Sequence, residues 1–303
     1  MSHSQTLGVG DALGTGDSYL TLNVLPPDLA AVAFDRLREQ VKWDVMHHRG
    51  GEVPRLVAVE GLVSTDGSYP IYRHPADESP ILHPFSPTVE AIRQHVQGVL
   101  QHPVNHVLIQ FYRTGTDYIS EHSDKTIDVV RGSNIVNVSL GAQRVMTLRL
   151  KRERAQSAET EDLDPGQPPT PRTTQRIPLP HNSMFVMGPE TNAKWLHGIK
   201  QDNRFITYKS EAETFQLGER ISLTFRHIGT FLNGDQTRIW GQGATSKTAD
   251  TAQPVLHGAK ESENLVIAFG AENHQIDFDW DKHYGMGFDV VNFKTKDDEE
   301  QML

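Results

Sequence analysis

Apolar residues recur at helical spacing in two early segments of the chain. Residues 26–41 carry an apolar stripe, and their two prolines suit the first turn of a helix. Residues 86–102 repeat the pattern, with Ser86 placed to cap the helix and Pro87 to open it. The spacing predicts two amphipathic helices, each of which buries one face.

From about residue 105 the pattern changes to short apolar runs rich in β-branched residues and separated by Gly, Asn and Asp. The runs are VLIQFY, SNIVNVSLG, RVMTLRL, SMFVMG and RISLTFR. Two helices followed by a series of strands favour an α+β fold, or a β-sandwich with helices packed on one side.

The other segments define the expected domain organisation. We expect residues 1–20 to be a flexible N-terminus and residues 21–230 to form one domain. Within that domain, the polar and proline-rich residues 151–176 predict a long loop insertion between strands. Residues 231–295 hold many aromatic side chains, which predicts an extension packed on the core, whereas residues 296–303 predict a flexible acidic tail.

Composition limits the chemistry. The chain has 303 residues, 37% hydrophobic and 22% charged, as is usual for globular proteins. It has no cysteine, so any metal must be bound by His, Asp or Glu. No apolar run is long enough to span a membrane, and the first residues lack the pattern of a secretory signal. We therefore expect an intracellular protein, cytoplasmic or nuclear, while the oligomeric state stays open.

The charge makes a nucleic-acid partner less favourable. The net charge is −10, and residues 227–303 carry thirteen acidic against six basic side chains, a local balance of −7. Proteins that follow a phosphate backbone usually present a basic face, and long-range steering of a negative chain toward it is weak.

Two side chains in EHSDKTIDV suggest a metal site. On an extended segment His122 and Asp124 point to the same face, because side chains alternate. The best third ligand is His197, just past the run SMFVMG. Two imidazoles and one carboxylate leave three positions open, a pattern that suits non-haem ferrous iron. Taken alone, the His–Asp pair is more simply explained as a solvated surface turn, since the chain has 15 histidines.

The run RISLTFR adds two arginines with a shared direction. On a strand, Arg220 and Arg226 lie on the same face as Ser222 and Thr224. Two inward guanidiniums need anions, and a dicarboxylate would satisfy both through paired hydrogen bonds. An exposed sheet face with two solvated arginines is the alternative.

The combined pattern resembles the AlkB branch of the Fe(II)/2-oxoglutarate dioxygenases over about residues 42–227. The resemblance is carried by LIQFYRTGTDYISEHSD, NIVNVSLGAQRVMTLR, LPHNSMFVMGPETNAKWLH and RISLTFR, in that order, with VPR at 53–55 upstream. It implies a double-stranded β-helix (jelly-roll) core with N-terminal helices on one side. It also implies Fe(II) as cofactor, bound by His122, Asp124 and His197, with 2-oxoglutarate and O₂ as co-substrates.

The resemblance assigns the co-substrate contacts as well. Arg220 would pair with the distal carboxylate of 2-oxoglutarate, aided by Tyr112, and Arg226 would lie near the carboxylate that chelates iron. Gln110 and Ser222 stand where similar proteins have asparagines that hold 2-oxoglutarate. Oxidative decarboxylation would yield succinate and CO₂ while a C–H bond of the substrate is oxidised.

Several positions differ from the DNA-repair members of that family. Glu60 replaces a tyrosine of the base pocket, and His47 falls roughly where a duplex-wedging aromatic residue is expected. Lys125 and Thr126 follow the His–Asp motif in place of acidic residues that contact the base. The spacing after the second histidine is longer than usual, so residues 200–219 are expected to be an insertion near the pocket mouth.

These differences favour a small substrate. Lys125 would bind a substrate carboxylate at the rim of the iron site and Glu60 a substrate amine, which would suit an amino-acid-like metabolite. A solvated surface position explains Lys125 equally well. Arg55, Tyr69 and Tyr72 are further candidates for substrate binding. The expected reaction is hydroxylation, desaturation or oxidative cyclisation, as in secondary metabolism.

Two alternatives stay open. Oxidative demethylation of alkylated nucleic-acid bases would need a basic groove near His122, for which Lys42, Arg49, Arg55 and Arg73 are the candidates. A binding module that kept the barrel but lost turnover is the other alternative, and the complete ligand set argues against it.

Overall fold

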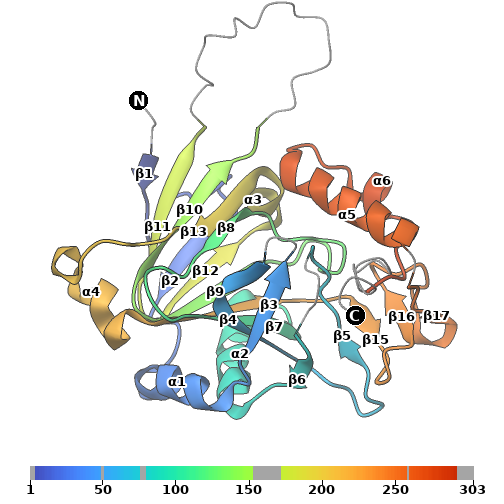
Figure 1. The fold of residues 1–303 in the computed structure, drawn as a ribbon, viewed down its shortest axis with the longest axis horizontal. Helices are drawn as coiled ribbons and strands as arrows, with labels where there is room; N and C mark the ends of the chain where they lie inside the picture. The colour runs from blue at the N-terminus through green and yellow to red at the C-terminus, as the bar shows by residue number, and fades with distance from the viewer. Residues whose placement is uncertain (1–3, 49–50, 76–79, 153–171, 258, 292–303) are drawn as a thin grey trace, which may run out of the picture.

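Two β-sheets stack to form the centre of the molecule (Figure 1). The computed structural model describes residues 4–48, 51–75, 80–152, 172–257 and 259–291. The smaller sheet has the strand order β1 (Ser4–Thr6), β11 (Thr174–Leu179), β10 (Arg144–Leu150), β13 (Trp195–Ile199), β8 (Ile119–His122). The larger sheet has the order β2 (Tyr19–Leu22), β12 (Ser183–Met187), β9 (Ile135–Gly141), β14 (Arg220–Arg226), β7 (His106–Tyr112), β4 (Gly51–Gly61), β3 (Asp44–His48), and β6 (Leu82–Pro84) pairs with β4.

Apolar side chains of both sheets meet in one buried cluster. Leu148 and Ile177 of the smaller sheet pack in the same cluster as Phe185 and Tyr112 of the larger one. Two facing, mostly antiparallel sheets of this topology form a jelly roll, and with its helices the chain is an α+β protein, as predicted.

The two predicted helices cover the outer face of the larger sheet. They are α1 (Pro27–Gln40) and α2 (Pro87–Leu100), and their apolar stripes join a cluster with strands β7, β9 and β14. Ser86 occupies the N-cap position of α2, but its side chain makes no capping bond, which corrects the prediction. The amide of Ser86 donates instead to Glu60 Oε2 at 2.7 Å, and that of Thr88 donates to Gln40 Oε1 at 3.3 Å.

The N-terminal segment is part of the fold where the structure describes it. Residues 4–20, expected to be flexible, include the fully buried Leu13 and strand β1, which pairs with β11. Asp17 caps the short helix α3 (Pro189–Lys194) by accepting the amide hydrogen of Glu190 at 2.8 Å. The expectation of flexibility is wrong for these residues because their partners lie far along the chain.

The C-terminal residues add a third sheet and two helices beside the core (Figure 1). The sheet has the order β17 (Gln253–Pro254), β16 (Arg238–Gly241), β15 (Thr230–Leu232), β5 (Tyr69–Pro70). Helix α5 (Ala259–His274) packs with α6 (Trp280–Tyr284) against Ile127. The expected acidic tail, 296–303, and most of the expected loop insertion, 153–171, lie outside the described residues.

A buried ion pair ties this C-terminal part to the core. Arg73 Nη2 lies 2.6 Å from Asp128 Oδ1, and both side chains are almost fully buried. Arg73 Nη1 also donates to the carbonyl oxygens of Phe288 and Val290, at 2.6 and 3.1 Å. The short helix α4 (Glu211–Thr214) lies between β13 and β14 along the chain, and no described helix is long and apolar enough to cross a membrane.

Candidate active site

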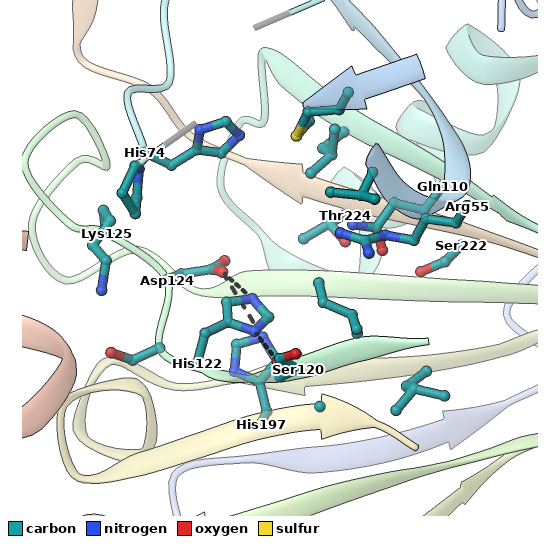
Figure 2. A pocket seen from close by; sticks show the side chains of 18 of the residues that line it. Arg55, His74, Gln110, Ser120, His122, Asp124, Lys125, His197, Ser222 and Thr224 are labelled. Carbon is teal, nitrogen blue, oxygen red and sulfur yellow. Dashed lines mark hydrogen bonds and ion pairs between the residues drawn. The ribbon is translucent and has the colours of Figure 1, made fainter. Parts of the chain in front are cut away.

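Three predicted ligands meet at the end of one strand pair. Strand β13 pairs with β8 so that His197 lies directly opposite His122. Asp124 follows β8, and its Oδ1 lies 3.6 Å from His122 Nε2 and 3.8 Å from His197 Nε2. The three ligand atoms all lie within 4.8 Å of one another, and Figure 2 shows both imidazoles turned toward the carboxylate. This spacing fits one divalent ion bound by three protein groups.

Neighbouring groups fix the orientation of these ligands. The Nδ1 atom of His122 lies 2.8 Å from the carbonyl oxygen of Ser120, so Nδ1 donates and the lone pair of Nε2 faces the site. The backbone of Asp124 exchanges two hydrogen bonds with the side-chain amide of Asn192 in α3, at 2.9 and 3.0 Å. The positions are therefore set by backbone contacts that do not depend on a metal.

The protonation states also suit a metal. Burial, and then the neighbouring His122, lower the pKa of His197 to about 3, so its imidazole is neutral at physiological pH. Burial alone would raise the pKa of Asp124, but Arg226 and the two imidazoles hold that pKa well below its usual value. The neutral imidazole of His197 and the carboxylate of Asp124 are donor forms that bind Fe(II).

Arg226 compensates the charge of the buried carboxylate. Its Nη2 and Nε atoms donate to Asp124 Oδ2 at 2.7 and 3.1 Å, and the ring of Tyr72 lies 3.9 Å from the guanidinium carbon. The third nitrogen, Nη1, is buried without a partner among the described residues. Arg226 thus orients the predicted ligand Asp124 and has one donor that is not used by the described residues.

Arg220 is buried with most of its hydrogen-bonding capacity unused. The side chain has no exposed surface, and only Nη2 donates, to Ser139 Oγ at 2.8 Å and Asn137 Oδ1 at 3.1 Å. Within the described residues, Nε and Nη1 have no partner. Burial lowers the pKa of Arg220 to about 10, so the group is still charged at neutral pH. A buried, unpaired guanidinium fits a site built to bind a carboxylate.

A cavity of about 630 Å³ is lined by the three predicted ligands and Arg226, and Arg220 lies behind its wall, where Nη2 donates to the lining residue Asn137. In Figure 2 the metal ligands lie between Lys125 on one side and Gln110, Ser222 and Thr224 on the other. A volume of this size is enough for a small co-substrate together with part of a second molecule. His122, Asp124 and His197 would hold iron, and Arg220 with its neighbours would hold 2-oxoglutarate. Once bound, the iron and 2-oxoglutarate would supply the chemistry that oxidises a C–H bond.

Three further predicted co-substrate residues lie on the cavity wall. Gln110, Tyr112 and Ser222 all line it. The hydroxyl of Tyr112 donates to Gln110 Oε1 at 2.9 Å, and its ring lies 5.1 Å from the guanidinium carbon of Arg220. Asn137, which sequence reasoning missed, also lines the cavity. Its alternation with Ser139 in SNIVNVSLG was a usable signal, because both polar side chains fall on one face of a strand.

Of the predicted substrate residues, three line the cavity. Tyr72 does so and accepts the amide hydrogen of Lys125 at 3.1 Å. Arg55 also lines it, with Nη1 donating to the carbonyl oxygen of Tyr118 at 2.9 Å. Lys125 is buried inside the cavity and not at an exposed rim, with Nζ donating to Asn273 Oδ1 at 3.3 Å.

The other two predicted substrate residues point elsewhere. Glu60 is buried against the first turn of α2 and does not line the cavity, so it cannot bind a substrate amine there. Tyr69 lies in β5, paired with Leu232 of the C-terminal sheet. None of residues 200–219 lines the cavity, so the expected insertion at the pocket mouth is also wrong. That segment instead packs near Ala142, whose amide donates to the carbonyl oxygen of Glu219 at 2.7 Å.

Substitution of Glu60 is therefore expected to lower the stability of the protein without changing its catalytic activity. Glu60→Ala should lower the free energy of unfolding by about 1–2 kcal/mol, because an amide at the start of α2 loses its acceptor. Glu60→Gln, which keeps an acceptor oxygen, should retain most of the stability. Thermal denaturation measures both, and a loss of turnover in either variant at unchanged melting temperature would contradict the assignment.

Comparison with known proteins defines the class. The 2OG-Fe(II) oxygenase superfamily matches residues 17–226, and the chain belongs to it. Fe(II) is the metal of this superfamily, with 2-oxoglutarate and O₂ as co-substrates, which agrees with the ligand set described above.

Particular relatives place the chain near the AlkB-like members, as the sequence pattern predicted. It is 35% identical over 146 residues to the DNA oxidative demethylase ALKBH2 of Homo sapiens, covering 48% of each chain. It is 26% identical over 229 residues to the DNA oxidative demethylase ALKBH2 of Arabidopsis thaliana, covering 71% of this chain and 68% of that one. It is 25% identical over 191 residues to the human alpha-ketoglutarate-dependent dioxygenase alkB homolog 3, covering 63% and 56%.

The similarity to these relatives covers only part of each chain. The chain spans about half the length of the human demethylase that it matches. Among solved structures it is similar to that of OsALKBH1, with a TM-score of 0.44 and 16% identity over 70% of this chain and 98% of that one.

Proposed function

We propose that the protein is a non-haem Fe(II)/2-oxoglutarate dioxygenase that oxidatively demethylates an alkylated nucleobase. The observation that carries the oxygenase activity is the fully buried Arg220, with two unpaired nitrogens, in the same core as three convergent metal ligands. The choice of a nucleobase as substrate is supported by the relatives, two of which are named DNA oxidative demethylases. The reaction balances when an N-methyl compound, 2-oxoglutarate and O₂ give the N–H compound, formaldehyde, succinate and CO₂.

The residues of this chain would bind and orient 2-oxoglutarate and would exclude water from the site. Arg220 would bind the distal carboxylate of 2-oxoglutarate, and Nη1 of Arg226 would donate to its other end. Met146, Phe185 and Met187 line the cavity with apolar side chains, which keeps water away from the reacting C–H bond.

A small amino-acid-like substrate is the second candidate, and the charges favour it. Of the four residues expected to build a basic groove, Arg73 is buried in an ion pair with Asp128, and Arg55 is buried in the wall of the cavity. Arg49 lies outside the described residues. Of the pair expected to bind a zwitterion, only Lys125 lines the cavity, so the amine would need another partner.

Product analysis separates these possibilities. The protein is loaded anaerobically with Fe(II) and 2-oxoglutarate, and succinate and formaldehyde are measured after O₂ is added. We expect formaldehyde from a single-stranded oligonucleotide with N-methylated bases, and none from its unmethylated counterpart. Succinate stimulated only by amino-acid derivatives would support the second candidate. Succinate formation stimulated by no compound would overturn both in favour of a non-catalytic module.

A further inference from the structure

One wall of the cavity comes from helix α5, which lies beyond the residues matched by the superfamily. The helix contributes Val266, Phe269, Gly270, Asn273 and His274 to the cavity lining. These positions are spaced by three or four residues, so they lie on one face of the helix. A segment outside the shared oxygenase core thus faces the same cavity as the metal ligands.

Buried hydrogen bonds fix this helix to the segment that carries the ligands. The carboxylate of Glu272 accepts the amide hydrogen of Thr126 at 3.0 Å and the hydroxyl of Tyr284 at 2.7 Å. Lys151 Nζ donates to the carbonyl oxygens of Glu272 and Ala193, both at 2.7 Å. Because these polar groups are buried and paired, α5 is held in register with residues 122–126.

Asn273 and Lys125 form a corner of the cavity that offers donors. The Oδ1 atom of Asn273 accepts from the amide of Ser123 at 3.0 Å and from Lys125 Nζ at 3.3 Å. Both side chains line the cavity. The oxygen of Asn273 is therefore used, while neither its amide nitrogen nor the Lys125 ammonium makes a further hydrogen bond to the described residues.

Gly270 provides room on the same face. A Cβ atom added there would meet no heavy atom within 4 Å, although the residue lines the cavity. Glycine in a helix interior is unfavourable by about 0.5–1 kcal/mol relative to alanine, so the helix gains no stability from it. The open space beside it is consistent with a position that a bound molecule occupies.

We propose that α5 is the substrate-selecting wall of the cavity. Asn273 and Lys125 bind an oxygen acceptor of the substrate, either a carbonyl or a carboxylate, and Gly270 sets the size that fits. This assignment rests on the proposed oxygenase function. It goes beyond that function because it names the group that the chain recognises and the element that selects it.

The position of the wall can be tested without any substrate. The chain has no cysteine, so Gly270→Cys can carry a single trifluoromethyl tag. With Mn(II) and 2-oxoglutarate bound, the fluorine resonance should broaden strongly, because position 270 lines the same cavity as the residues that would hold the paramagnetic ion. The matched control is Gly98→Cys in α2, an exposed helical glycine that also has free space but does not line the cavity. A resonance at position 270 as sharp as that at position 98 would overturn the assignment.

Selection is tested by kinetics with three probes: an N-methylated nucleoside, an N-methylated oligonucleotide and an N-methyl amino acid. Whichever probe the wild type turns over, Gly270→Trp and Asn273→Asp should each raise its KM by about tenfold or more. Gly270→Trp fills the cavity, and Asn273→Asp removes a hydrogen-bond donor. Their KM for 2-oxoglutarate should stay within about twofold of wild type, as should every parameter of Gly98→Trp. An unchanged substrate KM in Gly270→Trp would overturn the selection by α5. If the wild type turns over none of the probes, the demethylase proposal fails, while the fluorine experiment still decides where α5 lies.

Discussion

Asp124→Asn is expected to abolish metal binding and also to destabilise the metal-free protein by about 3–5 kcal/mol. The metal effect follows because a neutral amide replaces the anionic ligand. The stability effect follows because Arg226, only 2% exposed, donates two hydrogen bonds to that carboxylate and would be left as a buried charge without an anion. Titration calorimetry with Mn(II) measures the first effect, and urea denaturation in the presence of a chelator measures the second.

His122→Ala separates the two effects. This variant should also lose the metal, but its metal-free stability should change by less than about 1 kcal/mol, since the His122 side chain is 33% exposed and pairs with no buried charge except Asp124. Equal destabilisation of the two variants would show that the ion pair of Asp124 and Arg226 contributes little to folding. Neither variant should form succinate.

Several strands around the site could be predicted from the sequence because their patterns are local, but β8 and β13, which carry the two histidines, were not among the predicted runs. Strands β10 and β14 begin and end at the predicted residues, and α1 and α2 lie within the predicted helices. The alternation of side chains is also enough to predict that His122 and Asp124 share one face. What alternation could not supply is the pairing register of β8 and β13, which brings His197 opposite His122.

Glu60 was assigned to the substrate cavity, and the structure shows why that assignment is wrong. The second half of β4 is buried on both faces, so alternation no longer separates a cavity side from a helix side. The side chain turns toward α2, where the amide of Ser86 offers a partner, and burial raises its pKa. That partner lies 26 residues away along the chain, beyond the reach of any local pattern.

Helix α5 could not be predicted for a different reason. Its residues serve two surfaces: Leu265 and Ala268 pack only in the C-terminal cluster, Gly270 lines only the cavity, and Val266 and Phe269 contact both. Two contact surfaces give no single apolar stripe, so the aromatic residues predicted that this segment packs on the core but not that it forms a helix. A helix that closes a binding site is thus harder to predict than one that only covers a sheet.

Arg220→Met is expected to raise the KM for 2-oxoglutarate by roughly 30-fold to several-thousand-fold, because the loss of a buried charge-assisted pair costs about 2–5 kcal/mol. The stability of the metal-free protein should not fall. In the absence of a bound anion the guanidinium is a buried charge with two unpaired nitrogens, and methionine removes that desolvation cost. The increase in melting temperature that 2-oxoglutarate gives to the wild type should disappear in this variant.

Arg226→Met, six residues along the same strand, is the matched control and should behave in the opposite way. It removes the counter-charge of Asp124, so the metal-free protein should lose stability by about 3–5 kcal/mol. Thermal denaturation with and without 2-oxoglutarate compares the two variants directly. If Arg220→Met still binds 2-oxoglutarate with wild-type affinity, the distal carboxylate must bind elsewhere. Arg55 would then be the leading candidate, since it lines the cavity and its Nε is buried without a hydrogen-bond partner among the described residues.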